Sequence, residues 1–143
     1  MSHKQKLLNL LFGNIRGLYS QTNLSKPSIL LDLAEYKQCS IISIVETHLK
    51  PDITNNETTR EGWNVFRADR SHCSGGGAAI YVNNDHIISD EIIFSSDMCE
   101  LLGIYLTKSD LAVISIYRPP GCNTVDFSTA LNKIRSWLID LES

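Results

Sequence analysis

The sequence lacks a long hydrophobic run, a zinc-binding cysteine pattern and a secretory leader. No apolar stretch in its 143 residues approaches the ~20 residues that a membrane span needs, so we expect no membrane partner. The four cysteines form no C-x-x-C pair and have no histidines at matching spacing, which argues against a zinc site. Without a leader, the expected location is intracellular, nuclear or cytoplasmic, with free thiols.

An excess of positive charge is also missing. Thirteen Lys and Arg against sixteen Asp and Glu give a formal net charge of -3, whereas proteins that bind nucleic acid by neutralising phosphates usually carry a basic face. A phosphodiesterase that holds a metal ion on carboxylates can still be acidic overall. With 43% apolar and 20% charged residues, the composition is that of one soluble globular domain at most.

Apolar runs and turn signals predict a mixed α/β (α+β) fold. The expected strands are residues 7–12, 41–45, 63–67, 77–82, 86–94, 100–107 and 111–117, with a hairpin turn at 108–110. Two amphipathic helices are expected at 27–38, with Ser25 as N-cap, and at 126–141. Their apolar sides are predicted from residues at helical spacing, namely Ile29, Leu30, Leu33 and Tyr36 in the first helix and Phe127, Leu131, Ile134, Leu138 and Leu141 in the second.

Polar groups gather where the expected strands begin or end, in four short segments. These are residues 14–18 (NIRGL), 46–49 (ETHL), 75–82 (GGGAAIYV) and 117–120 (YRPP). Such groups can meet along one sheet edge, where active sites are often assembled. Glu46 is the strongest candidate, because Mg²⁺ prefers hard oxygen ligands and usually takes one or two protein carboxylates. The structural alternatives are a solvated strand-end glutamate, a turn asparagine at Asn14 and an interface tyrosine at Tyr117.

The four segments, in this order, resemble the start of the endonuclease/exonuclease/phosphatase (DNase I-like) family. Within it they are most similar to the apurinic-type endonuclease domain of non-LTR retrotransposon polyproteins. The resemblance implies a two-sheet sandwich, DNA as partner, Mg²⁺ or Mn²⁺ as cofactor, and nicking of target DNA for reverse transcription. It assigns metal binding to Glu46 and Asn14, contact with the scissile phosphate to Tyr117, and further substrate contacts to Arg118 and Arg70.

The resemblance covers residues from about Leu7 onward, but the family domain is longer than this chain. Residues 1–143 are therefore expected to be the N-terminal portion of such a domain, with one mixed sheet, outer helices and no facing sheet. The apolar face left uncovered would drive self-association.

Several charged groups have more ordinary interpretations. An ion pair between Asp69 and a neighbouring arginine is expected to stabilise the turn before the glycine run. The run itself precedes a strand, so a close-packed turn explains it better than a phosphate cradle, which needs a helix N-terminus. His48 is interpreted as a surface loop residue.

Hydrolysis of a phosphodiester needs an activated water and help for the leaving oxygen. The family supplies both from Gly-Asp-Phe-Asn and Ser-Asp-His segments, and neither occurs in this sequence. We therefore expect half of a site and no nicking by this chain alone. Two alternatives stay open: a domesticated, non-catalytic remnant that binds a protein or nucleic-acid partner, and a phosphatase or sphingomyelinase-like esterase of the same superfamily.

Overall fold

A computed structural model describes residues 8–20, 22, 24–70, 74–96 and 99–143. Among them, seven strands and three helices are present. The strands are β1 (Leu10–Asn14), β2 (Ile41–Val45), β3 (Trp63–Ala68), β4 (Ala78–Asn83), β5 (Ile88–Ser95), β6 (Glu100–Leu106) and β7 (Leu111–Tyr117). The helices are α1 (Lys26–Tyr36), α2 (Asn55–Thr58) and α3 (Thr124–Leu141).

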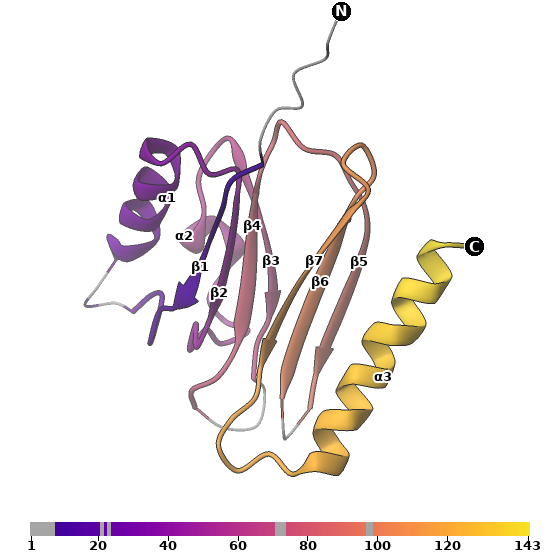
Figure 1. The fold of residues 1–143 in the computed structure, drawn as a ribbon. Helices are drawn as coiled ribbons and strands as arrows, with labels where there is room; N and C mark the ends of the chain where they lie inside the picture. Colours follow the sequence, from indigo (N-terminus) through magenta and orange to yellow (C-terminus); the bar gives the residue numbers. More distant parts are fainter. Residues whose placement is uncertain (1–7, 21, 23, 71–73, 97–98) are drawn as a thin grey trace, which may run out of the picture.

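The strands form two sheets that face each other, with α1 outside one and α3 outside the other (Figure 1). The first sheet has the order β1-β2-β4-β3 and the second the order β5-β6-β7. Strands β1 and β2 are parallel, with α1 as the crossover, and the other pairs are antiparallel. This order brings the last residues of β1, β2, β3 and β7 and the first residues of β4 and β6 to one end of the sandwich.

Alternating side chains divide the interior into three apolar clusters. The middle cluster lies between the two sheets, and it includes Ile41, Ile80, Val82, Leu102 and Ile104. The other two join each sheet to its outer helix: Leu30, Leu31 and Ala34 of α1 pack on the first sheet, and Ala130 and Ile134 of α3 pack on the second. Side chains thus pack on both faces of each sheet, although most residues of β1 stay exposed.

The structure confirms the predicted α/β class and the partial two-sheet sandwich. The expectation of a single sheet with no facing partner is wrong, because β5, β6 and β7 form a separate sheet that packs on the inner face of the first. Apolar runs indicate strands but do not say which strands share a ladder.

Among the described residues, each sheet ends in two edge strands, β1 and β3 in the first sheet and β5 and β7 in the second. Strand β1 pairs only with β2, and β7 pairs only with β6. The β1 and β7 edges lie on the same side of the sandwich, since β7 contacts β2 and β4 whereas β3 contacts β5 and β6. Phe12 of β1 is 81% exposed at this edge. No helix among the described residues is long and apolar enough to cross a lipid bilayer.

Candidate active site

Three of the predicted site residues meet at one end of the sandwich. Asn14 is the last residue of β1, Glu46 follows β2, and Tyr117 is the last residue of β7. The side chains of Asn14 and Tyr117 both lie close enough to the Glu46 carboxylate to lower its pKa as hydrogen-bond donors. The two sheets therefore contribute jointly to one polar cluster, as the sequence predicts.

Glu46 adopts a backbone conformation that residues with a side chain rarely use. Its φ is +56°, and that of His48, two residues on, is +54°. Left-handed backbone of this kind costs of order 1–3 kcal/mol and persists where neighbours fix it, often at functional sites. Here the fixing bonds come from both sides: Glu46 N donates to the Gly77 carbonyl over 2.8 Å, and the Glu46 carbonyl accepts from Gly17 N over 2.7 Å.

The glycine run at 75–77 packs against the segment that carries Glu46. Each of its three residues has a positive φ, and Gly76 also accepts a 2.9 Å hydrogen bond from His48 N. A Cβ atom on Gly77 would overlap the hydroxyl of the buried Thr47. The run therefore serves as a side-chain-free support for residues 46–48, in agreement with the predicted close-packed turn.

Asn14 is oriented by its own loop. Its side-chain oxygen accepts a 3.1 Å hydrogen bond from Arg16 N, which leaves the amide N–H₂ group to donate to Glu46. The same loop is tied to α1 by Lys26, whose ammonium donates to the carbonyls of Ile15 at 2.8 Å and Gly17 at 2.6 Å. Lys26 is a contributor that the sequence analysis missed.

The environment keeps the Glu46 carboxyl ionised. The hydrogen bond from Asn14, and next that from Tyr117, lower the pKa of Glu46 against the opposing effect of burial, and the electrostatic interactions with His48 and Arg16 lower it further. Bonds to the charged form favour ionisation. A carboxylate that carries its negative charge over a wide pH range suits a cation ligand.

Tyr117 is shifted in the opposite sense. Burial, and then the hydrogen bond to Glu46, raise the pKa of its phenol, while Arg70 opposes the shift. The phenol therefore remains protonated at neutral pH and can donate a hydrogen bond to an anionic oxygen.

The donor set fits a hard cation. Glu46 offers carboxylate oxygens and Asn14 an amide, and Mg²⁺ binds through one or two such groups while it keeps waters and substrate phosphate. Among the residues that the structure describes, no group of three or more His, Cys, Asp or Glu side chains gathers as a metal cage. Cys39, Cys99 and Cys122 are free thiols, and Cys73 lies outside the described residues.

The two arginines predicted to contact substrate are engaged within the protein. Arg118 donates to the Cys122 carbonyl at 3.2 Å and lies 4.7 Å from the centre of the Phe127 ring. Arg70 pairs with Glu100 at 2.7 Å. Their contacts with substrate stay predictions.

Two further expectations concern the turn after β3 and the loop after Glu46. The predicted ion pair of Asp69 is confirmed, with Arg67 Nη2 at 2.6 Å from its carboxylate. His48 is exposed, as expected for a surface loop residue. Among the described residues, neither the Arg67–Asp69 pair nor the His48 side chain forms a hydrogen bond with the Glu46 side chain.

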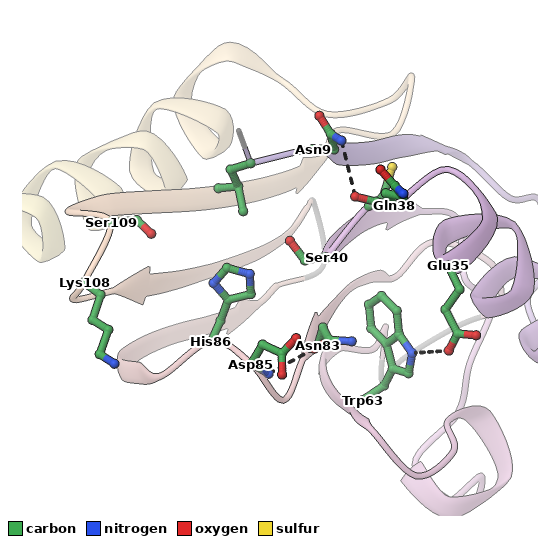
Figure 2. A pocket seen from close by; sticks show the side chains of 12 residues that line it. Asn9, Glu35, Gln38, Ser40, Trp63, Asn83, Asp85, His86, Lys108 and Ser109 are labelled. Atoms are coloured by element: carbon green, nitrogen blue, oxygen red, sulfur yellow. Dashed lines mark hydrogen bonds between the residues drawn. The ribbon is translucent and has the colours of Figure 1, made fainter. Parts of the chain in front are cut away.

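One recess lies at the other end of the sandwich. It has a volume of about 870 Å³ and is lined by residues at the start of β1, at the end of β4 and in the β6–β7 turn. Figure 2 shows Ser40, His86 and Lys108 around it, with the Trp63 indole turned to Glu35. It is therefore separate from the strand ends that carry Glu46.

Two facing sheets with outer helices form part of a DNase I-like fold. No protein-family model and no curated protein sequence matches the chain. Solved structures do, and they confirm the resemblance seen in the four segments at the level of the fold.

Three such structures are similar over most of this chain. An endonuclease/exonuclease/phosphatase family protein from Leptotrichia buccalis is 16% identical, with a TM-score of 0.64, over 89% of this chain and 63% of that one. The endonuclease domain of TRAS1, a telomere-specific non-LTR retrotransposon, is 18% identical, with a TM-score of 0.54, over 87% and 52%. The 3′ phosphatase NExo from Neisseria, bound to a product DNA hairpin, is 17% identical, with a TM-score of 0.58, over 76% and 40%. The chain thus spans between 40% and 63% of the length of these neighbours.

Proposed function

We propose that this chain supplies the metal- and phosphate-binding part of a Mg²⁺-dependent DNA endonuclease of the non-LTR retroelement type. The observation that carries the proposal is the convergence of Asn14 and Tyr117 on the ionised Glu46 carboxylate. Support for DNA as substrate comes from neighbours whose names include a retrotransposon endonuclease domain and a phosphatase bound to DNA.

Each residue has a distinct task in this proposal. Glu46 and Asn14 would hold Mg²⁺, and the ion would polarise the phosphodiester and stabilise its developing charge. Tyr117, protonated at neutral pH, donates a hydrogen bond to a phosphate oxygen. The strained backbone of Glu46 and its bonds to Gly17 and Gly77 keep the carboxylate in one place before substrate arrives.

Residues 1–143 contain no segment that corresponds to the family's water-activating groups. We infer that these residues are the N-terminal portion of a longer nuclease domain and that they do not cleave DNA alone. A reading frame that continues downstream of Ser143 into a Gly-Asp-Phe-Asn segment and then a reverse transcriptase supports the retroelement assignment. A non-catalytic remnant predicts instead a stable transcript that stops there.

Metal binding and cleavage are tested separately. Mn²⁺ binding, followed by electron paramagnetic resonance, is expected for the unaltered chain and is lost in Glu46→Gln. The matched control is Glu61→Gln, an exposed carboxylate outside the site, which retains binding. Equal binding by all three proteins contradicts the proposal.

Cleavage is measured as nicking of supercoiled plasmid in Mg²⁺. The unaltered chain and Glu46→Ala are both expected to give background levels. A nick that depends on Glu46 would show that these residues include a complete catalytic set, and would reject the incomplete site.

A further inference from the structure

A buried carboxylate lies beside the site without belonging to its predicted set. Glu100 is the first residue of β6, is fully buried, and stands opposite Tyr117 in the β6–β7 ladder. Its charge is met by Arg70, whose Nε lies 2.7 Å from Oε1. The Arg70 side chain is itself only 13% exposed. Buried ion pairs are costly to desolvate and add little net stability, so a gain in stability does not account for this pair.

The guanidinium of Arg70 contacts two parts of the site. Its central carbon lies 5.7 Å from the centre of the Tyr117 ring, within the range of a cation–π interaction. It also occupies the space next to Gly76: a Cβ atom there would come within 2.6 Å of Nε. A planar cation can rest on both an aromatic ring and a bare backbone, whereas an ammonium group has no flat face.

Gly76 and its neighbour Gly77 in turn bind the segment that carries the carboxylate. The Gly76 carbonyl accepts from His48 N, and the Gly77 carbonyl accepts from Glu46 N. Tyr117 ends a strand of the second sheet and Glu46 follows a strand of the first. Tyr117 lies beside the Glu100–Arg70 pair directly, whereas Glu46 is linked to it through Gly77 and Gly76. The pair is placed to set the distance between the phenol and the carboxylate.

We propose that Glu100 is a positioning residue, which holds the Arg70 guanidinium against the Tyr117 ring and the Gly76 backbone and thereby fixes the Tyr117 hydroxyl against Glu46. The proposal rests on the proposed function only in taking Tyr117 and Glu46 as the site. It assigns Arg70 a part in organising the site, distinct from its predicted contact with substrate.

Fluorine NMR of the full chain labelled with fluorotyrosine tests this placement without metal or DNA. The resonance of Tyr117 is identified as the one that Tyr117→Phe removes. In Glu100→Gln we expect this resonance to shift or broaden, and hydrogen exchange at the Glu46 and His48 amides to quicken about tenfold. Glu91→Gln, an exposed carboxylate on β5, is the control and should change neither.

A pair that only stabilises the fold would lower the melting temperature of Glu100→Gln but leave the Tyr117 resonance of the folded protein in place. That result overturns the proposal, as does an equal shift in Glu91→Gln. Where Glu100→Gln fails to fold, Arg70→Lys decides, because it keeps a positive charge near Glu100 but removes the planar group. We expect Arg70→Lys to displace the Tyr117 resonance, and an unchanged resonance overturns the proposal.

The two proposals fail separately. A chain that binds no Mn²⁺ but shows these shifts rejects the proposed function and retains the positioning role of Glu100. If Glu46→Gln abolishes Mn²⁺ binding but neither Glu100→Gln nor Arg70→Lys shifts the Tyr117 resonance, the proposed function is retained and the positioning role of Glu100 is rejected.

Discussion

The backbone N–H of Glu46 donates to the carbonyl of Gly77 over 2.8 Å, and the two residues both have left-handed φ values, +56° and +91°. The bond joins the end of β2 to the start of β4, where the two strands are antiparallel neighbours. Because Gly77 has no side chain, it can lie directly against Thr47. The conformation of the metal-ligand candidate therefore depends on a glycine 31 positions away in sequence, from 46 to 77.

Three glycine-to-alanine changes separate the backbone strain from the steric overlap. Gly77→Ala introduces both, since φ at this position is +91° and the new Cβ would overlap Thr47. Gly62→Ala introduces only the strain, since φ is +92° and no atom lies near the new Cβ. Gly121→Ala introduces neither. We expect Gly62→Ala to lower the free energy of unfolding by about 1–3 kcal/mol. Gly77→Ala should lose a further 1–3 kcal/mol or so, and Gly121→Ala should stay within about 0.5 kcal/mol of the unaltered chain.

Urea denaturation of the three variants measures this order. A Gly77→Ala variant as stable as Gly62→Ala would mean that Thr47 moves aside without cost, and that the glycine run does not fix Glu46.

The lowered pKa of Glu46 predicts how two substitutions move its titration. Asn14→Ala removes the larger lowering contribution and Tyr117→Phe the next, so both should raise the Glu46 pKa, Asn14→Ala more. NMR of the Glu46 carboxyl carbon against pH measures the shift. Tyr105→Phe is the matched control, since its hydroxyl donates to Asp110 in the β6–β7 turn. Identical titration in Tyr117→Phe and the unaltered chain would contradict the hydrogen bond.

The same shift has a consequence for stability. Because the folded-state pKa lies below the ordinary carboxyl value, ionised Glu46 stabilises the fold at pH values above that ordinary range. The contribution is lost as the pH falls through the lowered pKa. Asn14→Ala should therefore reduce stability at neutral pH more than at strongly acidic pH, which acid-series denaturation checks.

Substitution of Lys26 is expected to reduce stability locally, in the loop that follows Asn14. The Lys26 ammonium donates to two carbonyls of that loop, and hydrogen bonds to charged groups contribute about 1.5–3 kcal/mol each. Lys26→Met should lower the free energy of unfolding by about 1.5–3 kcal/mol, the contribution of one such bond. It should also quicken hydrogen exchange around Gly17. Lys108→Met, in the exposed β6–β7 turn, should change neither. Equal effects from both variants would contradict the role of Lys26.

The sequence predicts most elements and the location of the Glu46 cluster, because both depend on local patterns. The strands at 41–45 and 111–117 match the structure in both bounds, and the strand-end positions of Glu46 and Tyr117 follow from them. The first strand is expected at 7–12 but is Leu10–Asn14, so Asn14 is part of the strand and not of the loop after it. The partition into two sheets is missed, since it depends on pairing between distant segments. The four-residue helix α2, in a polar stretch, is missed as well.

The faces of the helices are predicted less well than their positions. In α1 the buried side is Pro27, Leu30, Leu31 and Ala34, while Ile29, Leu33 and Tyr36 are exposed. In α3 the buried residues are Ala130, Ile134 and Trp137, and Leu131 and Leu138 are exposed. Both helices are apolar on more than one side, so spacing alone cannot choose the face.

The sequence does not place Glu100 opposite Tyr117. The expected strands 100–107 and 111–117 pair Thr107 with Leu111, which puts Leu101 opposite Tyr117. The structure pairs Leu106 with Leu111, and this shift of one residue puts Glu100 there.

The exposed edge of the sandwich changes how self-association should occur. The second sheet covers much of the face that was expected to be bare, and two of the four edge strands, β1 and β7, lie on the same side. Unpaired edge strands with apolar side chains favour pairing with another chain, and a charged residue on the edge opposes it.

Phe12→Lys and Tyr36→Lys test whether the edge is the surface involved. Both aromatic side chains are 81% exposed, but Phe12 lies on the β1 edge and Tyr36 at the end of α1. We expect the unaltered chain to associate as its concentration rises, Phe12→Lys to remain monomeric because a charge now lies on the edge, and Tyr36→Lys to associate as the unaltered chain does. Sedimentation velocity over a concentration series measures the three. A monomeric unaltered chain would reject self-association, and equal loss in both variants would show that general exposed apolar surface, rather than the β1 edge, drives it.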